Sequence, residues 1–190
     1  MSTSLSDITT QIRFLINDSA KQGVDIFTYG SSALFTLTEA NVIGITSVLV
    51  NDVSSGVSYT FYSTTSKVKI DTPSLLTGDT IEVDYNFYPN YSDTELQDYC
   101  YSAMVHISNN NYKTFLIESA SYIYPDPDDR EVRLIAMVAC LLISPDNRSI
   151  RTPDLTINVP KDLPTSDKIS KLITYYKKDS HGIFTTAGKA

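Results

Sequence analysis

The glycines of this 190-residue chain are confined to a small part of it. Five of the seven lie between Gly23 and Gly78, and none occurs from Asp79 to His181. Tight turns and hairpins often require glycine, so its absence favours helices joined by longer connections. The sequence therefore predicts β-structure in the first half and mainly helices in the second, which is an α+β fold.

A two-residue alternation of apolar and polar side chains marks residues 26–88. The clearest run covers residues 80–88, directly after the turn signal at residues 77–79. This period is typical of strands with one buried and one solvated face. We expect four or five antiparallel strands, which form an inserted β-lobe.

Helix signals flank this lobe. Before it, Ser6 is placed to cap a helix over residues 6–18. After it, Ser92 and Glu95 form the pattern of a capping box ahead of a periodic apolar run that ends near residues 109–111.

A further helix is expected to begin at the prolines and acids of residues 125–129 and to end at Pro145. Its run 134–143 is apolar on all sides, which predicts a central buried helix. The preceding residues 113–124 are expected to form a short helix or turn.

Four prolines between residues 145 and 165 predict an extended connector, with one strand over residues 155–159. Thr165 or Ser166 is placed to cap a last helix. The expected apolar face of that helix consists of Ile169, Leu172, Ile173 and Tyr176. The basic residues expected off this face are Lys168, Lys171 and Lys178.

The chain is therefore expected to have three parts. Residues 1–25 and 89–145 form a helical core that resembles a bundle, and residues 26–88 form the inserted antiparallel β-lobe. Residues 146–190 form an extended C-terminal arm with a short helix and a flexible tail.

Composition excludes several classes of protein. The longest apolar run has ten residues, whereas a membrane span needs about 20. We expect no secretory signal at the N-terminus, and two cysteines do not make a disulfide framework. The net charge of −7 argues against a basic nucleic-acid binder.

The charge is unevenly distributed. Residues 1–147 hold 7 basic and 18 acidic side chains, a net charge of −11, whereas residues 148–190 hold 8 basic and 4 acidic ones, a net charge of +4. We expect an acidic body and a basic C-terminal arm with different partners.

No catalytic motif is visible, so we expect no enzyme, no cofactor and no metal ion. His106 is interpreted as a packed or half-exposed helix residue, and His181 as solvated. Cys100 and Cys140 are interpreted as buried free thiols. The acids within residues 126–129 fit a helix start better than a cation loop.

Tyrosine is abundant, with eight of thirteen between Tyr85 and Tyr124. These rings fit the edge of a core or a subunit contact equally well. Residues 175–178 fit a solvated helix end or a docking element, and we favour docking of the last helix and the residues after it on a protein partner. The residues expected at that interface are Lys171, Tyr175, Tyr176, Lys177, Lys178, Ile183 and Phe184.

The order of elements over residues 5–145 resembles the head-to-tail connector (adaptor) proteins of tailed bacteriophages. The segments that carry this resemblance are residues 45–51, 59–62, 77–79, 81–85 and 91–96, together with Pro73. The most specific piece is the passage from the last strand into the capping box, residues 79–96.

The resemblance implies a structural protein of the virion neck, assembled in the host cytoplasm. Such proteins form a ring, typically of about twelve copies, under the portal. The ring extends the channel for double-stranded DNA, which passes without specific binding, and it carries the next neck or tail protein. The acidic body fits such a channel, because negative side chains repel phosphates.

Two other functions fit the same sequence. Within the phage neck, the chain fits a tail-completion or stopper protein. From another class, the β-lobe fits a receptor- or glycan-binding module of the virion, since residues 26–88 are rich in Ser, Thr and Tyr.

Overall fold

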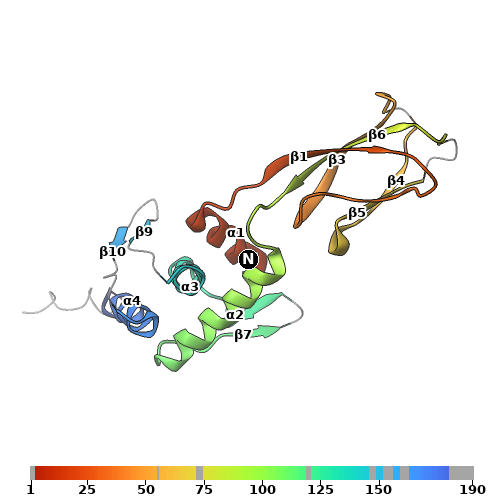
Figure 1. Ribbon diagram of the computed structural model, residues 1–190. Coiled ribbons are helices and arrows are strands. Elements are labelled where there is room, and N and C mark those ends of the chain that lie inside the picture. Colours follow the sequence, from red (N-terminus) through yellow and green to blue (C-terminus); the bar gives the residue numbers. More distant parts are fainter. Residues whose placement is uncertain are drawn as a thin grey trace, which may run out of the picture. The chain divides into compact units, whose positions relative to one another are not determined.

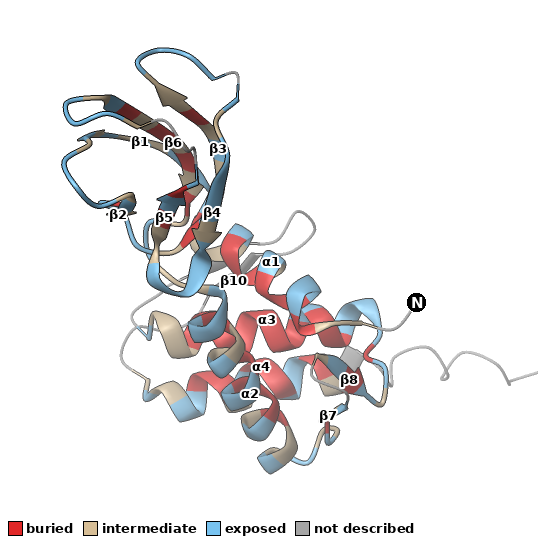
Figure 2. Cartoon of the chain, turned by 90° about the vertical axis from the view of Figure 1, so that its right-hand side faces the viewer, coloured by how far each residue is buried: buried red, intermediate tan, exposed pale blue. Residues whose placement is uncertain are grey.

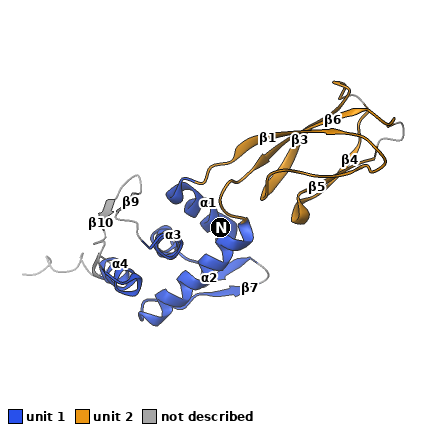
Figure 3. Cartoon of the chain, in the orientation of Figure 1, with its two compact units in different colours: residues 1–17, 93–190 blue, residues 18–92 orange. Residues whose placement is uncertain are grey.

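A computed structural model gives the structure of the protein and describes residues 3–54, 56–71, 75–118, 121–145, 149–151, 156–158 and 163–179. The fold is α+β, as the sequence predicted. The chain forms two compact units (Figure 3). These are a helical unit, residues 1–17 and 93–190, and a β unit, residues 18–92.

The helical unit contains four helices and two short antiparallel hairpins within the described residues (Figure 1). The helices are α1 (Leu5–Ile16), α2 (Asp93–Asn109), α3 (Asp129–Ile143) and α4 (Thr165–Asp179). The hairpin strands are β7 (Leu116–Glu118), β8 (Tyr122–Tyr124), β9 (Ser149–Arg151) and β10 (Thr156–Asn158).

Helix α3 is the centre of the helical unit, because it contacts α1, α2 and α4. Every residue from Leu134 to Leu141 is buried, which confirms the predicted central helix (Figure 2). The helix is capped by Asp128, whose carboxylate accepts the Glu131 N–H at 2.8 Å, while the Glu131 carboxylate accepts the Asp128 N–H at 3.1 Å. This reciprocal capping box explains why acids precede the apolar run.

The β unit consists of two three-stranded antiparallel sheets. In the first, β6 (Thr80–Phe87) lies between β1 (Lys21–Thr28) and β3 (Val42–Val50). In the second, β5 (Lys67–Ile70) lies between β2 (Leu34–Thr36) and β4 (Tyr59–Tyr62). A single 3₁₀ turn, η1 (Ser63–Thr65), joins β4 to β5.

Buried side chains of both sheets form one apolar core. The members from the first sheet include Val48, Ile81, Val83 and Tyr85, and those from the second are Val68 and Ile70. Between β1 and β2, the rings of Phe27 and Phe35 are 4.8 Å apart. The two sheets therefore cover one another as a small sandwich.

Helix α1 begins slightly earlier than predicted. Its N-cap is Ser4, not Ser6, because the Ser4 hydroxyl accepts the Asp7 N–H and the Asp7 carboxylate accepts the Ser4 N–H. At the other end, Asn17 adopts a left-handed conformation with φ of 57°, and the helix stops at Ile16. Asn is one of the few non-glycine residues that tolerate this conformation.

The β unit is also larger than predicted, with six strands in its described residues. It begins at Asp18 and ends at Ser92, whereas the expected lobe covered residues 26–88. The difference arises because β1 starts at Lys21, which pairs with Phe87 at the far end of β6.

A short helix or turn was expected over residues 113–124, but the described residues of this range, 113–118 and 121–124, form no helix. They contain the β7–β8 hairpin, which the N-terminal residues extend: the Leu5 N–H donates to the Ser121 carbonyl at 2.8 Å, and the Ile123 N–H donates to the Thr3 carbonyl at 3.2 Å. These partners lie more than 100 positions apart in the chain, so no local pattern reveals them.

Helix α4 packs on α3 and belongs to the helical unit. Thr165 and Ser166 lie inside its first turn and not before it. The predicted apolar face is confirmed, since all four of its side chains are buried. Lys168, expected off that face, is also buried, and its ammonium donates to the Pro145 carbonyl at 2.5 Å.

The two cysteines are free and buried, as predicted, Cys100 on α2 and Cys140 on α3. Burial raises the pKa of each thiol to about 12, so neither forms much thiolate at neutral pH. We expect Ellman's reagent at pH 7.5 to label both thiols at least about 100-fold more slowly in the native chain than in urea. Complete labelling of the native chain within minutes would contradict this burial.

Candidate partner-binding surfaces

The structure places Tyr176, predicted to contact a partner, inside the helical unit. Its side chain is only 5% exposed, its hydroxyl lies 3.7 Å from the Met137 sulfur, and the Arg130 guanidinium lies 5.7 Å from its ring centre. A ring held by α3 in this way stabilises the unit and is not accessible to a partner. Helical spacing correctly placed Tyr176 on the apolar face of the last helix. It did not show that this face packs inside the unit, so Tyr176 was also predicted at the partner interface.

The other predicted interface residues divide into three groups. Lys171 and Tyr175 are exposed on α4. Lys177 is half-buried, and its ammonium donates to the Asn110 carbonyl at 2.6 Å. The side chain of Lys178 and residues Ile183 and Phe184 lie outside the part of the chain that the structure describes.

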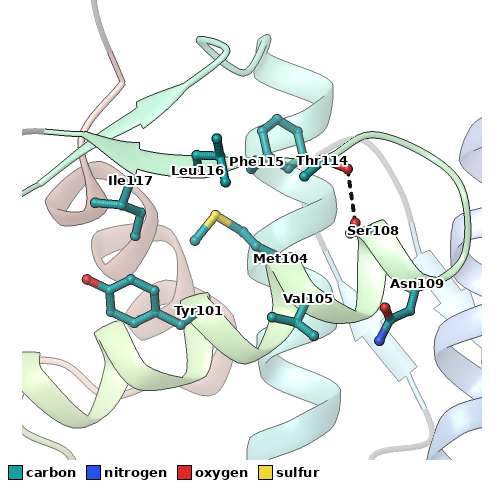
Figure 4. A pocket seen from close by; sticks show the side chains of 9 residues that line it. All are labelled: Tyr101, Met104, Val105, Ser108, Asn109, Thr114, Phe115, Leu116 and Ile117. Atoms are coloured by element: carbon teal, nitrogen blue, oxygen red, sulfur yellow. Dashed lines mark hydrogen bonds between the residues drawn. The ribbon is translucent and has the colours of Figure 1, made fainter.

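A groove that the sequence did not predict lies between α2 and the segment that leads into β7 (Figure 4). Its volume is about 340 Å³. The side chains around it come from the second half of α2 and from residues 114–117. Tyr101 and Ile117 lie at one end of the groove, and Asn109 and Thr114 lie at the other.

The lining of this groove is mainly apolar. Tyr101, Val105 and Leu116 are 40%, 57% and 60% exposed, while Met104 and Phe115 are buried. Such a cluster of exposed apolar side chains is typical of a surface that contacts another polypeptide segment.

A signal for part of the groove was present in the sequence. Tyr101 and Val105 are four positions apart and lie off the buried stripe of α2, which consists of Leu96, Cys100, Ala103 and Ile107, with Met104 beside it. The other wall was missed because residues 113–124 were not expected to form strands.

Strand β1 forms a second exposed apolar surface. It pairs with β6 along all eight of its residues and is the edge of its sheet. Tyr29 directly follows β1, and its N–H donates to the carbonyl of Asp79, the residue before β6. This bond shows which backbone groups of β1 point toward β6. Because backbone direction alternates, the N–H and C=O groups of Thr28, Ile26, Val24 and Gln22 point away from β6.

These outward-pointing residues also have exposed side chains, and Val24 and Ile26 are 56% and 66% exposed. Within the described residues, no backbone hydrogen bond joins this side of β1 to another strand. In contrast, β3 at the opposite edge is interrupted by two register shifts, and β2 and β4 have only three and four residues. β1 is therefore the long regular edge of the unit, the kind that pairs with a further strand.

The solvated face of this sheet is acidic at its centre. Glu82 and Asp84 alternate with the buried residues of β6, and the Ser47 hydroxyl donates to the Asp84 carboxylate. The whole β unit has eight acidic and three basic side chains, a net charge of −5.

The acids at the start of α3 have structural roles. Asp128 is the N-cap, Asp129 lies in the first turn, and the Asp126 carboxylate accepts the Thr3 N–H at 2.7 Å, which lowers the pKa of Asp126. Among the residues that the structure describes, no three His, Cys, Asp or Glu side chains are grouped to hold a metal ion. His106, predicted to be packed or half-exposed, is half-buried on α2.

No helix in the described ranges is long and apolar enough to cross a membrane. Comparisons with known proteins do not assign the chain to a family: no family model matches it, and no curated protein matches it. A functional proposal therefore depends on the architecture and on the two apolar surfaces.

Proposed function

We propose that the protein is a head-to-tail adaptor of a tailed bacteriophage, which forms a ring under the portal and joins the capsid to the tail. The observation that carries this proposal is a β unit, inserted between the first two helices of a helical unit, that presents the open edge of β1. An inserted unit with an unpaired edge supplies a subunit contact separate from the helices.

The ring contact is expected at β1. A closed ring needs a heterologous contact, in which one surface of each copy meets a different surface of the next. Addition of a strand from the next copy to β1 would satisfy the outward backbone groups of Val24 and Ile26 and would cover their side chains.

The charge of the β unit fits a position near DNA. With a net charge of −5, this unit repels phosphates, so double-stranded DNA would slide past it without specific binding. The portal contact is expected on the basic residues 148–190, where Lys171 and Tyr175 are exposed. We place the protein in the virion neck, between the portal and the next neck or tail protein.

The decisive experiment measures the mass of particles formed by the full-length chain alone and with portal rings of its own phage. We expect a small species alone and a ring of about a dozen copies on the portal, which negative-stain microscopy would resolve. Binding only after another neck protein is present would indicate a stopper. Binding to a glycan array without portal binding would indicate a receptor-binding module.

The edge of β1 provides a sharper prediction. We expect the double substitution Val24→Lys and Ile26→Lys to reduce ring formation on portal by at least about tenfold, because charged residues on an edge strand prevent pairing. Both side chains are more than half exposed, so the melting temperature should change little. The matched control is Val53→Lys, which alters a side chain of similar exposure, 54%, in the turn after β3. Equal ring yields from the two variants would exclude β1 as the contact.

A further inference from the structure

The Asn109 end of the groove between α2 and β7 adjoins α4. Asn110, the residue after the groove-lining Asn109, binds α4 twice: its side-chain oxygen accepts the Ser170 hydroxyl at 2.8 Å, and its carbonyl accepts the Lys177 ammonium at 2.6 Å. The chain leaves α4 at Asp179, two positions after Lys177. Residues 180–190 therefore follow in the chain directly after a part of α4 that is bonded to the Asn109 end of the groove.

The length of this segment suits the groove. The eight positions from Tyr101 to Asn109 cover about 12 Å along α2. The five positions from Asp179 to Phe184 span up to about 17 Å when extended, and the five from Phe184 to Lys189 span as much again. The ten positions from Asp179 to Lys189 thus span more than twice the length of this wall, which leaves enough chain to cross from α4 and to lie along the groove.

The chemistry of the segment also matches the groove. Residues 180–190 contain no acid, one lysine and one histidine, and their large apolar residues are Ile183 and Phe184. Beyond the far end of the groove, near Tyr101 and Ile117, are two exposed acids, Asp98 one turn before Tyr101 on α2 and Glu118 next to Ile117 on β7. An apolar pair followed by a lysine fits an apolar groove with an acidic end.

We propose that residues 180–190 bind in the groove of their own chain. Ile183 and Phe184 cover Val105 and Leu116, and Lys189 lies beside Asp98 and Glu118. The segment thereby covers the exposed apolar side chains of the groove in the free protein.

The same chain is the favoured source of the segment. A short tether gives an effective concentration in the millimolar range, which far exceeds the concentration of other copies in a dilute solution. This inference depends on the groove and the neighbouring helix end, and it does not require the adaptor function.

A peptide-binding experiment tests this contact without any phage component. The probe is a fluorescent peptide of residues 180–190, and its partner is the chain shortened to residues 1–179, with an unchanged melting temperature as the check on folding. We expect binding to the shortened chain and at least about tenfold weaker binding to the full-length chain, whose own segment competes.

Matched variants assign the contact to specific side chains. The peptide with Ile183→Ser and Phe184→Ser, and the shortened chain with Val105→Ser and Leu116→Ser, should each bind at least about tenfold more weakly. The control, Val24→Ser and Ile26→Ser in the β unit, should bind the peptide like the unaltered shortened chain. Absence of peptide binding, or equal binding to shortened and full-length chains, would overturn the inference.

Hydrogen exchange of the full-length chain distinguishes the source of the segment. We expect residues 114–118 to exchange at least about tenfold faster after Ile183→Ser and Phe184→Ser, equally at high and low protein concentration. Protection that disappears on dilution would identify a second copy as the occupant, and unchanged exchange would show that the segment does not cover the groove.

Discussion

Replacing Leu134 with alanine is expected to lower the free energy of unfolding of the helical unit by about 3 kcal/mol, within a usual range of about 2–5 kcal/mol. Leu134 is fully buried on α3, the helix that contacts all three other helices of this unit. The loss combines the transfer energy of the removed methyl groups with the cavity left in a core that cannot collapse around it.

Urea denaturation, followed by far-UV circular dichroism at 222 nm, measures this loss. The control is Phe14→Ala on α1 of the same unit, where the side chain is 69% exposed and a change below about 0.5 kcal/mol is expected. A loss for Leu134→Ala no larger than that of the control would show that α3 is not the centre of the unit.

The elements predicted best from the sequence are those with local signals. The capping-box pattern of Ser92 and Glu95 predicted α2, which begins at Asp93. The apolar run after Asp128 predicted α3. Capping and helical periodicity depend on residues a few positions apart, so a sequence pattern contains the whole signal.

The elements missed were those that depend on distant partners. The β7–β8 hairpin is completed by the backbone of Thr3 and Leu5, and no glycine marks its turn. The start of β1 was missed because its first residues gain strand geometry by pairing with the end of β6, more than 60 positions away.

The candidate surfaces also divide into those that a local sequence pattern predicts and those that depend on distant residues. Helical spacing placed Tyr176 on the apolar face of α4, yet only the structure shows that Met137 and Arg130 hold it away from partners. The groove needs two walls from separate elements, and the sequence indicated only the α2 wall. Surfaces built from two elements therefore require the tertiary structure, whereas single-helix faces do not.

Gly23 illustrates how a contact with a distant residue restricts which amino acid fits at one position. The sequence analysis expected the β-lobe to begin at residue 26, but the structure places Gly23 inside β1, directly under the ring of Tyr85. The Tyr85 ring is 1% exposed, its hydroxyl donates to the Asp25 carboxylate at 3.1 Å, and burial is the main cause that raises the pKa of this phenol to about 12. A ring fixed in this way leaves no room for a side chain at position 23.

Gly23→Ala is therefore expected to lower the free energy of unfolding of the β unit by about 2 kcal/mol. A Cβ atom at this position would lie 2.6 Å from the Tyr85 ring, far inside van der Waals contact. Chemical denaturation followed by tyrosine fluorescence measures the effect. The matched control is Gly44→Ala in β3, where an added Cβ meets no atom within 4 Å and the expected change is below about 0.5 kcal/mol.

A double-mutant cycle separates this clash from any effect of alanine on the strand itself. In a Tyr85→Leu background the shorter side chain no longer reaches over position 23, so Gly23→Ala should cost less than about 0.5 kcal/mol there. The resulting coupling energy of more than about 1 kcal/mol would assign the requirement for glycine to the aromatic ring. An equal cost in both backgrounds would instead assign it to the backbone of β1, and the close approach of Tyr85 would then not explain why this strand contains a glycine.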